Sequence, residues 1–337
     1  QLEGIYSKTI NNVFFENLAL TKVGEVYAVP GVNASAAPFY SNASSAYENI
    51  INLKNTNKGY SYALSAQLEK YFDFGLDVAA SYTYGRSRSV NDGTSSVAYS
   101  NWKFNYSRDT NGPGEMGYSK FDIPHRVMVR LNYNSPKYCQ GWLSTSVGIV
   151  YTGTSGGRYS LTMNEKDDFN GDGWRGNNLL YIPTKDELSK MNFIASTDKK
   201  GNVTTADQAR QLFEDWIQGN SYARTHRGQY AERNSCMTDW ENNIDLHFGQ
   251  SIHLKNLVRL EFTLDVINFT NMLNKRWGTT YGNAYNVSPI MVNKIVTTGA
   301  AGNIVAEPSY TYNPNANPTP SDIASRWHMQ LGFRIAF

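Results

Sequence analysis

The sequence has few cysteines, modest charge and no long apolar run. Its 337 residues include two cysteines, Cys139 and Cys236, and neither belongs to a CxxC pair, which excludes a disulfide framework, a zinc ribbon and an iron–sulfur site. The 31 basic and 29 acidic residues leave a formal net charge of +2, so the clustered basic surface that a nucleic-acid partner requires is not expected. The mean hydropathy is −0.50, and no segment reaches the roughly 18–20 apolar residues of a membrane helix.

Membrane-spanning strands remain compatible with this composition, because each needs only about 10 residues with every second one facing lipid. The clearest example is the C-terminal segment 327–337, in which six large apolar residues alternate with five polar or small ones. This strict period of two predicts a strand with one apolar and one polar face. Aromatic residues make up 13% of the chain, which suits the aromatic girdles of such a barrel.

Seven further segments fit the same interpretation, the first of them only weakly: 3–20, 60–68, 76–84, 127–133, 143–151, 244–252 and 258–266. The connections between them alternate between short ones, at 70–75, 135–141 and 254–257, and long ones, at 21–57, 87–123, 154–239 and 270–325. The sequence therefore predicts an all-β fold, a transmembrane antiparallel β-barrel in the bacterial outer membrane. Its apolar face would contact outer-membrane lipid. Its long loops would be extracellular, and its C-terminus would lie on the periplasmic side.

Ionisable residues gather on the polar faces of these strands. In a dry core each would cost several kcal/mol unless paired, so they predict a wet or plugged lumen. The simpler interpretation of any one of them is a paired lumen residue without a substrate role. The predicted lumen-facing residues are Asp77, Arg126, Arg130, Asp245, His247, Arg259, Glu261, Asp265, His328 and Arg334.

Three stretches resemble the C-terminal barrel of TonB-dependent transporters of the Oar-like and SusC-like type. They are DFNGDG at 168–173 with GNNLLYIP at 176–183, RGQYAERN at 227–234 with Trp240 and Asp245, and LDVINFTNMLN at 264–274 with Trp277-Gly278. The resemblance implies that residues 1–337 are the C-terminal part of a 22-stranded barrel, with the plug domain absent from this chain. It also implies coupling to the TonB complex through missing N-terminal parts, and a surface lipoprotein as a candidate partner.

The last strand resembles the signal by which bacterial outer-membrane barrels engage the barrel-assembly machinery. Its apolar side carries Trp327, Leu331, Phe333, Ile335 and Phe337. An unpaired edge strand must be templated during folding to avoid aggregation. Phe337→Ala is therefore expected to impair insertion, and unchanged surface levels of the mutant would contradict this.

One loop matches the first half of a calcium-binding loop. Asp168, Asn170 and Asp172 stand at positions 1, 3 and 5, and Gly173 stands at position 6. Position 12, where a bidentate Glu belongs, is Leu179, so calcium would need a further ligand such as Asp167 or a carbonyl. The alternative is an Asx-rich turn that binds its own backbone. No cofactor is required by either interpretation.

The sequence of the largest loop also predicts one amphipathic helix. Thr205 and Gln208 form a capping box, and apolar residues follow with helical spacing up to Gly219. Packing onto its own loop is favoured over insertion into the membrane surface, because the polar face is not basic. The GxSxG match at 153–157 follows a strand into a loop and lacks the helix of a nucleophile elbow, so no enzymatic activity is expected.

Three functions are compatible with these patterns. The first is energy-coupled uptake of a large nutrient through a plugged barrel. The second is a self-contained eight-stranded barrel that acts as an adhesin or scaffold, in which residues 1–12 would pair with 326–337. The third is a secreted β-sandwich that binds glycans.

Overall fold

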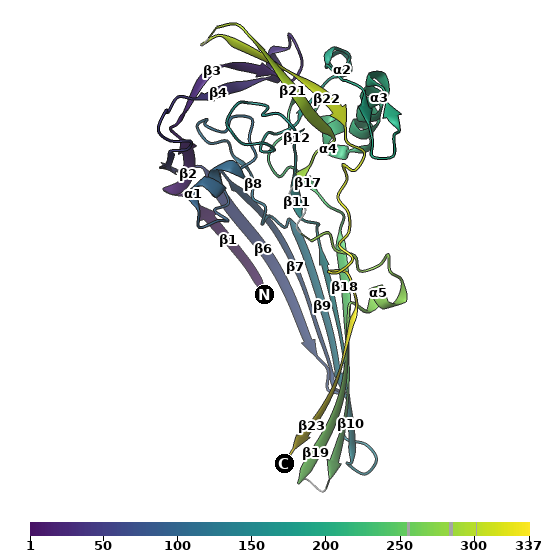
Figure 1. Ribbon diagram of the computed structural model, residues 1–337. Coiled ribbons are helices and arrows are strands. Elements are labelled where there is room, and N and C mark those ends of the chain that lie inside the picture. The colour runs from purple at the N-terminus through teal and green to yellow at the C-terminus, as the bar shows by residue number, and fades with distance from the viewer. Residues whose placement is uncertain (255–256, 283–285, 301) are drawn as a thin grey trace.

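A large antiparallel sheet forms most of the molecule's length (Figure 1). The computed structural model describes all residues except 255–256, 283–285 and 301. Along the sheet the strand order is β1-β6-β7-β9-β10-β18-β19-β23, and β8 (Gly117–Tyr118) pairs with the end of β7. The eight strands of the main path are β1 (Leu2–Lys8), β6 (Gly59–Tyr71), β7 (Leu76–Ser89), β9 (His125–Asn134), β10 (Leu143–Thr154), β18 (Glu241–Leu254), β19 (Val258–Ile267) and β23 (His328–Ala336).

Short and long connections alternate along this path, as the sequence predicts. Residues 72–75 and 135–142 form two short turns, and residues 255–256 of the third lie outside the described residues. Gly75 has a φ of +96°, and a Cβ there would lie 2.0 Å from the carbonyl oxygen of Asn134, so the first turn requires glycine. The long connections are residues 9–58, 90–124, 155–240 and 268–327.

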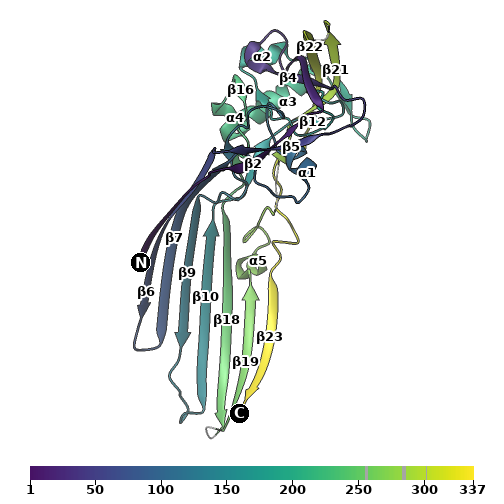
Figure 2. The ribbon, with the colours of Figure 1, turned by 90° about the vertical axis from the view of Figure 1, so that its left-hand side faces the viewer.

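The sheet is open in the described part of the chain. There β1 pairs only with β6 and β23 pairs only with β19, and these two strands lie at opposite edges (Figure 2). The pairing of residues 1–12 with 326–337 that a closed eight-stranded barrel needs is not found among the described residues.

The four long connections pack together at one end of the sheet, and we call this part of the molecule the loop body (Figure 1). Three of the connections build a five-stranded sheet of order β12-β21-β22-β3-β4. Its strands are β3 (Leu20–Tyr27), β4 (Ala36–Asn42), β12 (Asn164–Glu165), β21 (Ile290–Thr298) and β22 (Ile304–Tyr312).

Shorter elements complete the loop body. The small strands are β2 (Asn12–Asn17), β5 (Ile51–Thr56), β11 (Arg158–Leu161), β13 (Tyr181–Ile182), β14 (Ser196–Thr197), β15 (Val203–Thr204), β16 (Gln229–Tyr230), β17 (Cys236–Met237) and β20 (Asn286–Val287). The helical segments of the loop body are η1 (Asn33–Ser35), α1 (Ala98–Lys103), α2 (Lys185–Lys190), α3 (Ala206–Gly219) and α4 (Ser221–Thr225). Helix α5 (Phe269–Leu273) lies beside β18 instead (Figure 1). In the described ranges, none of these helices has the length and apolar content needed to cross a membrane.

The prediction of a single loop helix was therefore wrong. The helix that it named is present as α3, and both hydrogen bonds of its capping box form, between Thr205 and Gln208. The other helices are at most six residues long, too short to show an apolar period in the sequence.

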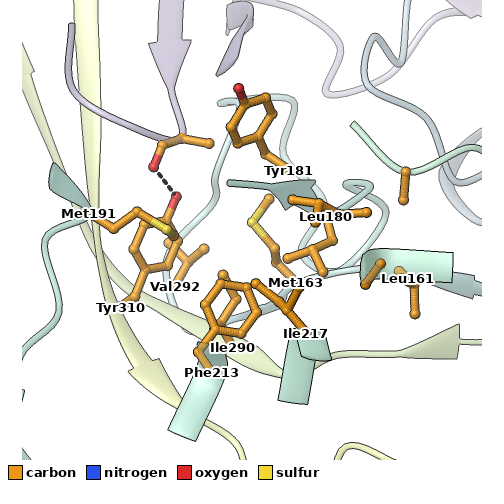
Figure 3. Packing of buried hydrophobic residues seen from close by; sticks show 14 of the residues in the cluster. Leu161, Met163, Leu180, Tyr181, Met191, Phe213, Ile217, Ile290, Val292 and Tyr310 are labelled. Atoms are coloured by element: carbon orange, nitrogen blue, oxygen red, sulfur yellow. Dashed lines mark hydrogen bonds between the residues drawn. The ribbon is translucent and has the colours of Figure 1, made fainter. Parts of the chain in front are cut away.

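The hydrophobic core lies in the loop body and not in the large sheet (Figure 3). It joins residues from all the connections that build the five-stranded sheet and its helices. Among its fully buried side chains are Leu161, Leu180, Ile182, Phe213, Ile217, Ile290 and Val292. The connections 9–58, 155–240 and 268–327 therefore share one hydrophobic core.

Helix α3 packs onto this core. Ala209, Phe213 and Ile217 are fully buried, and the Trp216 indole donates a hydrogen bond of 2.8 Å to the carbonyl of Ala316. The burial confirms that α3 packs within the loop body, where it contacts its own loop through Phe193 and another connection through Ala316.

Candidate functional site

The two faces of the large sheet differ in chemistry. Strand pairing aligns side chains across the sheet, so neighbours in a cross-strand row share one face. One row places Val147, Phe248, Leu264 and Leu331 side by side. On this face Phe262, Leu331 and Phe333 are 44%, 65% and 67% exposed. An exposed apolar surface of this extent marks contact with a partner or a membrane.

Gln250 interrupts the run of apolar residues on this face of β18, between Phe248 and Ile252. Its side-chain oxygen accepts hydrogen bonds from the hydroxyls of Thr145, at 2.8 Å, and Tyr138, at 3.2 Å. These contacts satisfy the amide near the short-turn end of the sheet.

The opposite face carries all ten of the ionisable residues singled out in the sequence. The strand registers place Asp77, Asn132, Gly148, His247, Asp265 and Gln330 in one row across it. Arg130 and Asp245 flank Val150 in the neighbouring row, and Glu261 stands opposite Arg334. The remaining members of this face are Arg126, Arg259 and His328.

Several of these residues are paired with one another. The Arg130 guanidinium lies 3.0 Å from Asp77, and the His247 Nδ1 lies 2.6 Å from Asp265. Arg259 and Glu261 are 3.7 Å apart, and Asp245 accepts a hydrogen bond of 2.8 Å from the Asn268 backbone. These partners are part-exposed, so each pair stabilises the sheet by no more than about 1 kcal/mol. Their arrangement gives a surface on which acidic and basic side chains are paired.

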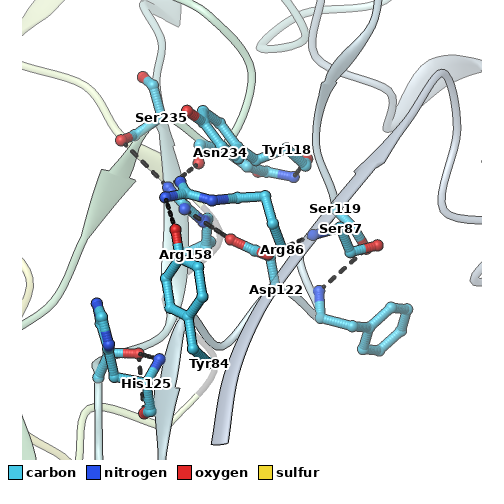
Figure 4. Close-up of polar contacts among 12 residues, drawn as sticks. Tyr84, Arg86, Ser87, Tyr118, Ser119, Asp122, His125, Arg158, Asn234 and Ser235 are labelled. Atoms are coloured by element: carbon cyan, nitrogen blue, oxygen red, sulfur yellow. Dashed lines mark hydrogen bonds and ion pairs between the residues drawn. The ribbon is translucent and has the colours of Figure 1, made fainter. Parts of the chain in front are cut away.

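A buried ion pair joins the sheet to the loop body (Figure 4). Arg158, at the start of β11, binds Asp122, which precedes β9, at 2.6 Å, and the two side chains are 3% and 1% exposed. Asp122 also accepts a hydrogen bond of 2.5 Å from the Ser87 backbone on β7. The Arg158 guanidinium stacks 3.9 Å from the centre of the Tyr118 ring and donates to the carbonyl of Asn234.

Two further arginines bind at the same junction. Arg88 forms an ion pair with Glu232. Arg233 is buried and donates to the backbone carbonyls of Val90 and Ser89 and to the side chain of Asn105. Burial lowers the pKa of Arg233.

The sequence analysis did not identify this junction. Arg158 and Asp122 belong to no motif and are 36 residues apart, so only the folded chain shows that they pair. The sequence analysis did single out the stretch 227–234 for its family resemblance, and this stretch contributes Arg233 and Asn234 to the junction.

The loop with the calcium-like spacing is a network of turns. Asp168 accepts hydrogen bonds from the backbone of Gly171, at 2.9 Å, and of Gly173, at 2.7 Å. Asp172 accepts from Thr110, Asn177 and Asn170. The two Asp168 bonds are those of the Asx-rich turn offered as the alternative.

The side chains expected to bind calcium form other hydrogen bonds in this structure. Asn170 presents its amide nitrogen, not its oxygen, to Asp172, and Asp167 accepts a hydrogen bond from the backbone of Ile295. Across the described ranges, no three His, Cys, Asp or Glu side chains are grouped so as to hold a metal. Calcium binding by Asp168, Asn170 and Asp172 stays a prediction.

This loop nevertheless holds unusual carboxyl groups. Burial raises the pKa of Asp168 to about 6 and that of Glu165 to about 7, and it also raises the pKa of Asp172. Glu165, which the spacing did not identify, accepts hydrogen bonds from the Phe169 backbone and from Asn178.

The predicted assembly signal lies on the outermost strand. Trp327, Leu331, Phe333, Ile335 and Phe337 are all exposed, and β23 has a partner on one side only in the described part of the chain. This strand thus offers both an apolar surface and a free hydrogen-bonding edge.

An antiparallel sheet with one exposed apolar face and one polar face is typical of membrane β-barrels. The comparison with protein families agrees: the profile of the outer membrane beta barrel domain matches residues 6–326. The chain belongs to this family, and its place is the bacterial outer membrane. A search of curated proteins finds no match.

Proposed function

We propose that the chain forms the C-terminal part of the barrel of a TonB-dependent transporter, which takes up a large nutrient across the outer membrane. The observation that carries this proposal is the open sheet: β1 and β23 occupy opposite edges of the described sheet. A wall that does not close on itself at eight strands needs further strands, as a 22-stranded barrel would supply.

The chemistry of the two faces supports the same proposal. The apolar face would contact lipid, and the polar face with Arg130, Asp77, His247 and Asp265 would line a hydrated lumen around a plug. The loop body would lie outside the cell and capture the nutrient, with the C-terminus on the periplasmic side. This chain makes and breaks no bond; the energy-coupling complex of the inner membrane would displace the plug.

The test uses the full-length protein purified in detergent and the periplasmic domain of TonB as the probe. Biolayer interferometry is expected to detect binding that is lost when the residues preceding this 337-residue segment are deleted. Absence of binding by the full-length protein contradicts energy coupling and leaves a barrel of another kind. The barrel-assembly machinery is the expected partner during biogenesis, through Phe337 and its neighbours.

A further inference from the structure

Cationic and tyrosine side chains gather on the apolar face of the large sheet where it meets the loop body. The strand registers place them in the two rows of β1, β6 and β7 nearest that end. These rows, which we call the basic strip, are Lys8, Tyr60 and Arg88, and then Tyr6, Tyr62 and Arg86. The eight main strands, as far as the structure describes them, carry no Asp or Glu on this face. The face itself therefore supplies no negative charge to neutralise the basic strip.

Two cations of the basic strip form no ion pair in the described part of the chain. The third, Arg88, belongs to the ion pair at the junction. Lys8 is exposed, and its ammonium group donates to a backbone carbonyl of β6 at 3.3 Å. The half-buried Arg86 guanidinium donates to the Tyr84 hydroxyl at 3.5 Å. Asp122 acts on Arg86 only through space, because its own contacts go to the junction. Lys8 and Arg86 can therefore both bind an anion.

A groove of about 500 Å³ follows the basic strip on the same face. Its walls there are the next two rows, Gly4, Leu64 and Tyr84, and then Leu2, Ala66 and Tyr82. Gly4 and Ala66 are small and stand diagonally in these rows, so they leave space between larger side chains. Leu2 and Leu64 are 86% and 56% exposed, so the groove opens onto the surface expected to face lipid. An apolar groove in this position suits an acyl chain.

The basic strip has the chemistry of a site for a lipid headgroup. From the spacing and rise of strands, the Cα atoms of Lys8 and Arg86 lie roughly 10 Å apart across the sheet and roughly 7 Å apart along it. Their long side chains flank β6, which carries the hydroxyl groups of Tyr60 and Tyr62. Lys and Arg form charge-assisted hydrogen bonds with phosphate, and tyrosine is enriched at the level of lipid headgroups. Basic clusters at this level of a membrane protein recognise anionic lipids.

We propose that the basic strip and the groove bind one phosphate-bearing lipid of the outer leaflet. Its phosphate contacts Lys8 and Arg86, and one of its acyl chains lies in the groove beside Leu64 and Ala66. A neutral lipid leaves the two cations uncompensated, and a free anion gains nothing from the groove. The inference goes beyond the proposed transport, because it requires only that the apolar face contacts lipid and that the loop body lies outside the cell.

The experiment is native mass spectrometry of the full-length protein in detergent, titrated with monophosphoryl lipid A or with the same glycolipid lacking its phosphate. The phosphorylated lipid is expected to bind at least tenfold more tightly. The double variant Lys8→Gln with Arg86→Gln should lose most of this preference, and Arg86→Lys should retain it. Lys70→Gln is the matched control, because Lys70 is an exposed cation at the short-turn end of the same face.

A second variant tests the groove separately. Ala66→Phe fills the groove from the exposed surface, so it is expected to weaken binding of both lipids and to leave their ratio unchanged. Four results overturn the inference: equal binding of the two lipids, the same loss of preference in the double variant and in Lys70→Gln, unchanged binding by Ala66→Phe, or displacement of the lipid by millimolar inorganic phosphate. The measurement uses no TonB, so its failure is distinguishable from failure of the transporter proposal.

Discussion

At the scale of single residues, the two cysteines can test the burial of the loop body and the orientation of the sheet in the membrane. Cys139 is exposed in the turn between β9 and β10, while Cys236 is buried in β17, where burial raises its thiol pKa to about 12. A thiol with this pKa is about 1 part in 10⁴ thiolate at pH 8, so Cys236 should resist alkylation.

A membrane-impermeant maleimide is accordingly expected to label neither cysteine in intact cells. After permeabilisation of the outer membrane it should label Cys139 alone, and after denaturation both, as counted by mass spectrometry. Labelling of Cys139 in intact cells would place the short turns outside the cell, against the proposed orientation.

The Glu165 carboxyl group gives the loop body a pH dependence of defined sign. Its pKa is raised to about 7 from an ordinary 4.5, chiefly by burial, so the folded state holds a proton that the unfolded state releases. The stability from this group is complete below about pH 4.5 and is lost as the pH rises through 7.

We expect Glu165→Gln to raise the free energy of unfolding at pH 8 by about 1–3 kcal/mol and to leave it nearly unchanged at pH 4.5. Thermal unfolding midpoints in detergent across this pH range measure the effect. Glu48→Gln, at an exposed position, is the control. An equal shift at both pH values, or the same shift in the control, contradicts the assignment.

At the scale of elements, α3 is stabilised by the side chains that face the core. Phe213 is fully buried and contacts Phe193, whereas its neighbour Leu212 is 40% exposed. Phe213→Ala is expected to lower the free energy of unfolding by about 3–5 kcal/mol. Leu212→Ala should cost less than about 1 kcal/mol. Limited proteolysis of the loop body compares the two variants, and similar cleavage rates would indicate that α3 does not pack as described.

The elements that the sequence predicts well are those with a local cause. The long strands alternate between apolar and polar residues because their two faces differ. Helix α3 is predicted by the Thr205 capping box and by its 3.6-residue apolar period. The loop-body sheet could not be predicted in this way. Its parallel pair β3–β22 joins residues 280 positions apart, such as Gly24 and Ile304, and β22 contains Pro308.

The junction was unpredictable for a related reason. Arg158 and Asp122 have no local signal in the sequence. Their role as a buried ion pair follows only from their contact in the folded chain. The contacts of the calcium-like loop were equally hidden in the sequence. Only the folded chain shows that Asp168 accepts from the backbone of Gly171 and Gly173, and that Asp172 accepts from the Asn170 amide.

At the scale of the whole molecule, the question is whether the wall continues beyond its two edges. In a closed eight-stranded barrel β1 and β23 would be adjacent, with their strands about 4.8 Å apart and side chains of one face within disulfide range. In a larger barrel further strands would separate them. The polar face of β1 carries Glu3, Ile5 and Ser7, and that of β23 carries Gly332.

Cysteines introduced one at a time at Glu3, Ile5 or Ser7, together with Gly332→Cys in a Cys139→Ser background, test this directly. None of the three pairs is expected to cross-link in outer membranes under mild oxidation, read as a mobility shift on gels. Thr263→Cys with Gly332→Cys is the positive control, because these two positions are register partners in β19 and β23. A cross-link from β1 as efficient as the control would mean that the sheet closes at eight strands, which favours an adhesin or scaffold and excludes a 22-stranded transporter.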